Sequence, residues 1–170
     1  MDELRELADM DVLRQIVAHV HHTVVHRVGR RVAEQGAPRD QQRQLPKSTP
    51  MRFVSADGIE IAVGRNSLQN DRLTQAAGAN ETWLHAKELP GSHVIIRAEG
   101  EIPLKTMQQA ALLAAWFSKG KNSSTVPVDY TLRKYVKKPS GAAPGKVVYT
   151  HQKTVYVTAE EEEIKAIRNA

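Results

Sequence analysis

The sequence predicts an α+β protein in which a largely antiparallel β-sheet packs with one long helix and one or two short helices, preceded by an N-terminal helix. Three observations predict this class. Short alternating apolar segments separated by turn residues follow residue 50. One long Ala-rich helical segment stands among them without regular alternation of strands and helices. Apolar residues recur every three or four positions before residue 35.

The composition excludes several classes of protein. The 170 residues are 41% hydrophobic and 25% charged, which is typical of a folded globular chain. The absence of cysteine excludes disulfides and cysteine zinc sites. No apolar run approaches the roughly 18 residues of a membrane-spanning helix, and the N-terminus lacks the layout of a signal peptide. We therefore expect a cytoplasmic protein without membrane contact.

Three segments follow from these patterns. Residues 1–35 predict a helix that could pair with another copy or with a partner helix. Three histidines in it fall near one face, but no carboxylate completes a ligand set, so we expect no metal there. Residues 36–50, with three prolines and three glutamines, predict a linker. Residues 51–170 then form the main domain.

The main domain opens with a hairpin and a short helix. Strands are expected at 51–55 and 59–64, and Asn66 or Ser67 can cap a helix that Gly78 closes. The side of this helix expected to face the core comprises Leu68, Leu73 and Ala76, and the side expected outside comprises Arg65, Gln69 and Arg72.

The stretch 83–97 is the densest in chemistry. Two extended segments, 83–87 and 93–97, flank a Pro90-Gly91 turn. Because side chains alternate along a strand, Trp83, His85 and Lys87 share one face of the first segment, and His93, Ile95 and Arg97 share one face of the second. This patch is either a binding site or a satisfied structural cluster, and core burial is the simplest reading of Trp83.

The remaining elements continue the mixed pattern. The clearest helix spans 102–119, with Pro103 in its first turn. A strand over 126–136 is expected to point Asp129 and Thr131 outward. A basic loop, a hairpin of 147–150 with 154–158, and a terminal helix over 160–168 follow.

Catalysis is not indicated. The loop 141–146 has glycines and a lysine but fails as a phosphate loop, because it lacks the spacing, the Ser or Thr, and the following helix. His85 and His93 could act as acid and base, yet no nucleophile elbow, metal motif or close carboxylate pair accompanies them. We expect a protein that is not an enzyme and needs no cofactor.

The charge favours a nucleic-acid partner. The net charge is +5, and residues 119–153 carry eight Lys or Arg against one acid. The alternative is a lysine-rich surface kept for solubility. Cations available for phosphates are Arg65, Arg72, Lys87, Arg133, Lys137, Lys138 and Lys146. Groups that could stack or donate are Trp83, His85, His93 and Tyr135.

An ordered series of motifs over residues 51–158 resembles the NFACT-R domain of the RqcH/NEMF family. It includes DGIEIAVGRN at 57–66, QNDRLT at 69–74, WLHAK at 83–87, PGSHV at 90–94, AALLAAWFSK at 110–119 and VKKP at 136–139. The resemblance implies an RNA-binding domain of a protein that acts on stalled large ribosomal subunits. It also implies that residues 1–35 are the end of a coiled-coil arm.

The resemblance implies contacts with tRNA or large-subunit ribosomal RNA. The implied contact residues are Arg65, Asn70, Arg72, His85, Lys87, His93, Lys137 and Lys138, and the 139–145 loop would approach a phosphate. The chain is expected to be either part of a longer protein or a stand-alone form. Because some bacterial relatives are labelled fibronectin-binding proteins, an adhesive or protein-interaction module without an RNA role is the alternative.

Overall fold

The computed structural model describes residues 48–170, so the predicted helix over 1–35 and nearly all of the predicted linker lie outside the described residues. Along the chain the elements are β1 (Met51–Val54), β2 (Glu60–Val63), α2 (Ser67–Ala76), β3 (Thr82–Ala86), β4 (Val94–Ile96), α3 (Leu104–Trp116), β5 (Val126–Leu132), the 3-10 turn η2 (Arg133–Tyr135), β6 (Val136–Lys137), β7 (Val148–Tyr149), β8 (Lys153–Val157), α4 (Glu161–Lys165) and β9 (Arg168–Asn169).

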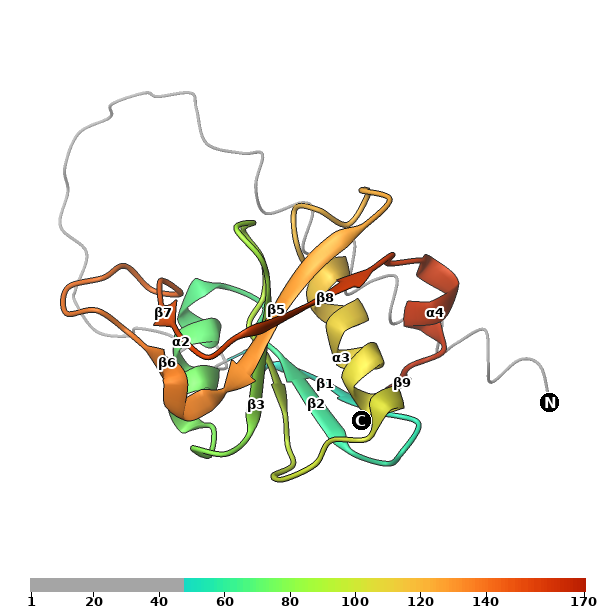
Figure 1. Cartoon of the computed structure of the whole chain (residues 1–170), viewed down its shortest axis with the longest axis horizontal. Helices are drawn as coiled ribbons and strands as arrows, with labels where there is room; N and C mark the ends of the chain where they lie inside the picture. The colour runs from blue at the N-terminus through green and yellow to red at the C-terminus, as the bar shows by residue number, and fades with distance from the viewer. Residues whose placement is uncertain (1–47) are drawn as a thin grey trace, which may run out of the picture. The chain divides into compact units, whose positions relative to one another are not determined.

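A seven-stranded sheet forms the middle layer, in the order β8-β5-β3-β4-β2-β1-β9, and each adjacent pair is antiparallel. The predicted α+β class is therefore confirmed. Figure 1 shows α3 and α4 on one side of the sheet and α2 with β6 and β7 on the other. In the described part of the chain no helix has the length and apolar character needed to cross a membrane.

The two faces of the sheet bury different residues because side chains alternate along each strand. Leu84, Val94 and Ile96 point toward the Ala-rich side of α3 and form the larger core. Trp83 and Ile95 point the opposite way and pack with residues of α2 and β6. The sheet is thus covered on both faces, and the stretch 83–97 contributes two central strands.

Coverage of the second face corrects one expectation. Asp129 and Thr131 of β5 do lie opposite the larger core, but they are buried, at 2% and 5% exposure. The Asp129 carboxylate accepts hydrogen bonds from the Tyr149 hydroxyl at 2.7 Å and the Thr154 hydroxyl at 2.6 Å. Polar residues therefore alternate with apolar ones along β5 because hydrogen-bond partners from β7 and β8 cover this face, and not because the face is exposed to water.

The C-terminal third also departs from the prediction. The expected strand over 126–136 ends at Leu132, and η2 turns the chain away from the sheet. The expected hairpin is wrong, because β7 pairs with β6 and β8 pairs with β5. The terminal helix is present as α4, and after it the chain returns to pair β9 with β1.

The orientation predicted for α2 is partly wrong: Leu73 is buried and Arg72 exposed as expected, but other positions are reversed. Leu68 is 50% exposed, while Gln69, expected outside, is 5% exposed. Asn66 caps the helix as predicted, since its Oδ1 accepts from the Gln69 N–H at 2.9 Å. Much of the buried side of α2 is polar, and its apolar contact comes from Leu73 with Ala77 just beyond the helix.

Gly64 lets α2 approach the end of β2. A Cβ built on Gly64 would lie 2.0 Å from the Asn70 Oδ1 atom, far inside contact distance. That oxygen accepts from the His93 N–H at 3.0 Å, so a side chain at Gly64 would displace a buried hydrogen bond.

We predict that Gly64→Ala lowers the free energy of unfolding by about 1–3 kcal/mol, because the added methyl overpacks the site and displaces the Asn70 amide. The matched control is Gly78→Ala, where the new Cβ meets ordinary contacts at 3.4 Å and no positive φ strains it. We expect this control to be neutral or to stabilise by about 0.4–1 kcal/mol. Denaturant unfolding of both variants provides the measurement, and equal losses would contradict the prediction.

Candidate nucleic-acid interface

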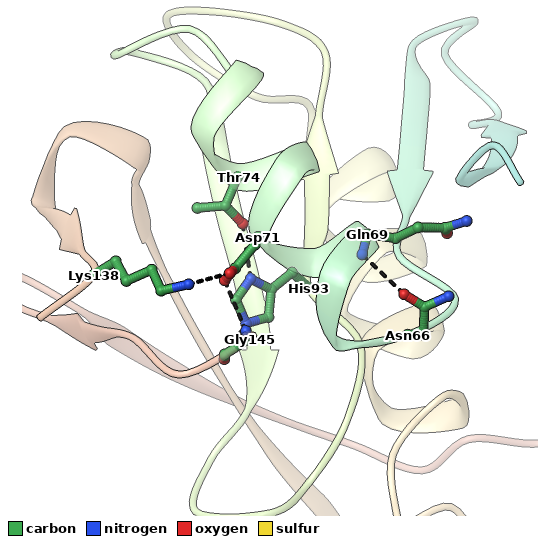
Figure 2. A network of polar contacts seen from close by, with 7 residues as sticks. All are labelled: Asn66, Gln69, Asp71, Thr74, His93, Lys138 and Gly145. Carbon is green, nitrogen blue, oxygen red and sulfur yellow. Dashed lines mark hydrogen bonds and ion pairs between the residues drawn. The ribbon is translucent and has the colours of Figure 1, made fainter. Parts of the chain in front are cut away.

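The polar side of α2 holds the loop 138–146 in place (Figure 2). The Asp71 carboxylate pairs with the Lys138 ammonium through one oxygen and accepts from the Gly145 N–H at 2.7 Å through the other. Burial acts to raise the pKa of Asp71, but the Lys138 ammonium and the Gly145 N–H outweigh it and hold that pKa below its ordinary value. Asp71 is therefore a charged anchor between α2 and the loop.

His93 completes this anchor beneath Asp71 (Figure 2). Its Nδ1 lies 2.7 Å from the Thr74 hydroxyl and its Nε2 lies 3.2 Å from the Gly145 carbonyl oxygen. Because the carbonyl can only accept, Nε2 carries the proton and Nδ1 accepts from Thr74. Burial, assisted by the neighbouring His85, lowers the pKa of His93 to about 4. The ring is neutral at pH 7.

Two of the predicted contact residues are internal. His93 is 1% exposed and Asn70 is 6% exposed. Besides accepting from His93, Asn70 donates from Nδ2 toward the Gly91 carbonyl oxygen at 3.4 Å. In this arrangement both residues mainly position the chain, and the little surface that they expose borders a cleft.

The predicted cations divide into two groups. Arg72, Lys137 and Lys146 are exposed, and the side chains of Arg72 and Lys137 form no hydrogen bond or ion pair with any residue that the structure describes. The other cations have partners within the domain or are partly buried. Arg65 donates to the Thr49 carbonyl at 2.9 Å, and Arg133 donates to the Thr74 carbonyl. Lys138 pairs with Asp71, and Lys87 is partly buried.

Several of these cations lie on α2 or on segments that contact it. Arg72 lies on the helix, Arg133 contacts it through Thr74, and the loop carrying Lys138 and Lys146 is anchored to it at Asp71. The acids Glu161, Glu162 and Glu163 lie on α4, which packs with α3 against the opposite side of the sheet. Several of the predicted cations therefore lie on the α2 side of the domain, away from the acids of α4.

A cleft of about 500 Å³ opens beside this basic rim. One wall is the turn 88–91 and the other is the segment 144–147, with His85 and Trp83 among the lining residues between them. Tyr149 also lines it, and its ring lies 4.8 Å from that of Trp83. The predicted residues His85 and Lys146 both line this cleft.

Trp83 is structural, as the simplest sequence reading held, at 0% exposure. Its ring stacks on the partly exposed His85 ring, with 5.8 Å between the ring centroids and 10° between the planes, and the His93 ring meets it edge-on at a centroid distance of 5.3 Å.

Burial lowers the pKa of His85, although backbone hydrogen bonds act to raise it, so this imidazole is also neutral at pH 7. Among the described residues, the Trp83 Nε1 is the buried side-chain polar atom left without a hydrogen-bond partner.

Some backbone amides of the loop 139–146 have acceptors within the domain and are not directed at a ligand. The Gly145 N–H donates to Asp71, and those of Ala142 and Lys146 donate to the carbonyls of Pro139 and Ala143. The positive φ values of Gly141 and Gly145, 74° and 81°, instead let the loop turn tightly onto α2.

The sequence reading missed the residues that organise the site. The sequence offers Asp71 as a possible partner of the two histidines or as a residue that holds its own turn, but gives no sign that it anchors a distant loop, and Thr74, Tyr149 and Glu88 carry no signal. Clustering of Asn66, Gln69, Asn70 and Asp71 around one short helix could have indicated a buried polar side. No group of three or more His, Asp or Glu side chains within residues 48–170 is placed to hold a metal ion.

The fold and this face define a small binding module, a three-layer α+β domain that presents exposed cations beside an aromatic cleft. The family model described as the NFACT protein RNA binding domain matches residues 49–160. The chain belongs to this family, as its motifs predicted.

Individual relatives agree with this assignment. The chain is 44% identical over 132 residues to the Rqc2 homolog RqcH of Bacillus subtilis and 42% identical over 132 residues to that of Streptococcus suis, covering 76% of this chain in each case. It spans about a quarter of their length, 23% and 24%. A solved structure of the C-terminal part of the fibronectin/fibrinogen-binding protein from Streptococcus suis matches with a TM-score of 0.69 and 38% identity, covering 95% of this chain and 61% of that one.

We predict that acid weakens the domain through His93. Between its ordinary pKa of 6.5 and its folded value of about 4, the unfolded chain binds this proton and the folded chain does not. Stability therefore rises with pH across this window and is lost as pH falls, by up to about 3 kcal/mol from His93, with His85 acting in the same direction.

Urea unfolding of the wild type and His93→Gln at about pH 7 and about pH 4.5 measures the effect. Glutamine retains a donor and an acceptor but does not titrate, so the variant should lose less stability than the wild type on acidification. An equal loss in both proteins would assign the pH dependence to other groups.

Proposed function

We propose that this domain binds RNA through its α2 side and acts in ribosome-associated quality control, contacting tRNA or large-subunit ribosomal RNA in the cytoplasm. The observation that carries the proposal is the gathering of exposed cations around α2 beside the aromatic cleft. Membership of a family described as an RNA binding domain supports it, as do relatives that carry the name Rqc2 homolog RqcH.

The proposed role is binding and not catalysis. The two histidines that could have served as acid and base lie 5.4 Å apart, but both ring nitrogens of His93 have internal partners. A neutral, internally bonded imidazole suits a structural position better than proton transfer to a substrate. The proposed role requires neither a cofactor nor a metal.

Phosphate binding should rest on cations that the fold leaves available. Lys138 already neutralises Asp71, and reversing its charge would also release the loop. Arg72 and Lys137 are exposed and form none of the anchoring contacts, so they test binding without disturbing the fold.

We predict that Arg72→Glu with Lys137→Glu weakens tRNA binding about tenfold or more at low salt and lowers the slope of log affinity against log salt by about one for each phosphate that the variant no longer neutralises. Fluorescence anisotropy with labelled tRNA over a salt series measures both quantities. The matched control is Lys105→Glu, an exposed charge reversal on α3 across the sheet, which should change the affinity less than about twofold.

Two results would contradict this assignment. Absence of tRNA and ribosomal RNA binding by the wild type at low salt would remove the proposed function. Equal binding by the double variant and the wild type would leave RNA binding in place but exclude the α2 side as its site.

A second candidate is a protein-interaction module, favoured by the similarity to the solved fibronectin/fibrinogen-binding protein. Affinity capture from a lysate, with and without nuclease treatment, separates the two. Partners that are lost after nuclease treatment support the RNA-binding proposal, whereas direct binding of purified fibronectin with a defined stoichiometry would support the alternative.

A further inference from the structure

We propose that the cleft between the turn 88–91 and the segment 144–147 takes one unpaired nucleobase of the bound RNA, while flanking phosphates lie on the cationic rim. This inference rests on the proposed RNA-binding function and adds to it that single-stranded nucleotides are distinguished from paired ones.

The interior of the cleft fits a flat aromatic group. His85 lines it as a partly exposed ring whose plane is fixed by stacking on the buried Trp83. Leu89, Pro144 and Val147 supply apolar surface on both walls. A volume of about 500 Å³ lies within the range of small-molecule sites. Unpaired bases are commonly held between such rings and apolar side chains.

The charges favour a base over a phosphate inside the cleft. Its two imidazoles are neutral at pH 7, because burial lowers the pKa of each. The Glu88 carboxylate lines one wall and would repel a phosphate, but it can accept from an exocyclic amino group. Lys146 also lines the cleft, its side chain is exposed, and it supplies a cation for a phosphate at the rim.

Both walls are held before any ligand arrives. The 88–91 turn is anchored by hydrogen bonds from the Lys87 N–H to the Pro127 carbonyl and from the Lys119 N–H to the Pro90 carbonyl, each 2.9 Å. It also places Glu88 at a φ of 54°, a conformation that non-glycine residues rarely adopt and that is found at binding sites. The opposite wall is held through Gly145 by Asp71 and His93. A preformed cleft loses little conformational entropy when it binds.

The test compares short single-stranded RNAs that differ at one central nucleotide, by fluorescence anisotropy with the full chain. We expect removal of the central base, leaving an abasic sugar, to weaken binding about 5- to 150-fold, the range for stacking one base. A duplex of the same sequence should bind more weakly than the single strand. Adenine should bind more tightly than uracil at the central position, because only adenine offers an amino group to Glu88.

Three variants assign the effect to the cleft. His85→Ala should abolish the difference between the base-containing and the abasic RNA, and His85→Phe, which retains a flat ring, should preserve it. Glu88→Gln should abolish the preference for adenine over uracil without changing the abasic ratio. Lys105→Glu, across the sheet, should change none of these ratios, and thermal unfolding verifies that each variant is folded.

The outcomes distinguish this inference from the proposed function. If abasic and base-containing RNAs bind equally, the base cleft is excluded while RNA binding stands. If no RNA binds, both proposals fail. Adenosine monophosphate serves as a competitor. Weak competition supports the proposal that the cleft binds a nucleotide of an RNA chain. If adenosine monophosphate binds as tightly as the oligonucleotide, the proposal is overturned and the cleft is a site for a free nucleotide.

Discussion

The buried carboxylate of Asp71 is the constraint on which the candidate interface depends. A carboxylate removed from water is unfavourable unless donors surround it, and this one receives the Lys138 ammonium and the Gly145 N–H. Both donors belong to a loop far along the chain, so helix and loop hold each other. His93 adds a further contact to the same loop residue. The wall of the cleft and the positions of its cations follow from this small network.

The two faces of the sheet differ in character: the α3 side holds the larger apolar core, and the α2 side holds the candidate interface. On the α3 side, alternating aliphatic residues meet an Ala-rich helix, and the contact is largely apolar. On the α2 side, imidazoles, amides and a carboxylate are buried beside aromatic rings. Such a network is favourable only while every member is satisfied, so it specifies one arrangement of the loop and not a range of them.

Much of the fold was predictable from the sequence, because alternation and helical periodicity report apolar burial directly. The same reasoning misplaced α2, whose buried side includes Gln69, Asn70 and Asp71, since apolar periodicity cannot detect a face held by hydrogen bonds. The two-residue strands β6, β7 and β9 are too short to carry any pattern. The cations were identified correctly as residues, but no local signal links Lys138 to Asp71, which lies 67 positions away.

That pairing also changes how the basic surface is read. A lysine whose charge already neutralises a carboxylate adds little to the field beyond its own contact distance, since the pair is close to neutral from outside. The count of cations therefore overstates the potential around α2 by the charge of Lys138. The predicted cations without a carboxylate partner supply the rest, and the most accessible of them are Arg72 and Lys137 on the surface and Lys146 at the cleft. Affinity for a polyanion then comes from the rim. Selectivity requires a different element, and the neutral aromatic cleft beside that rim is the part of this face that can read a base without competing for its phosphate.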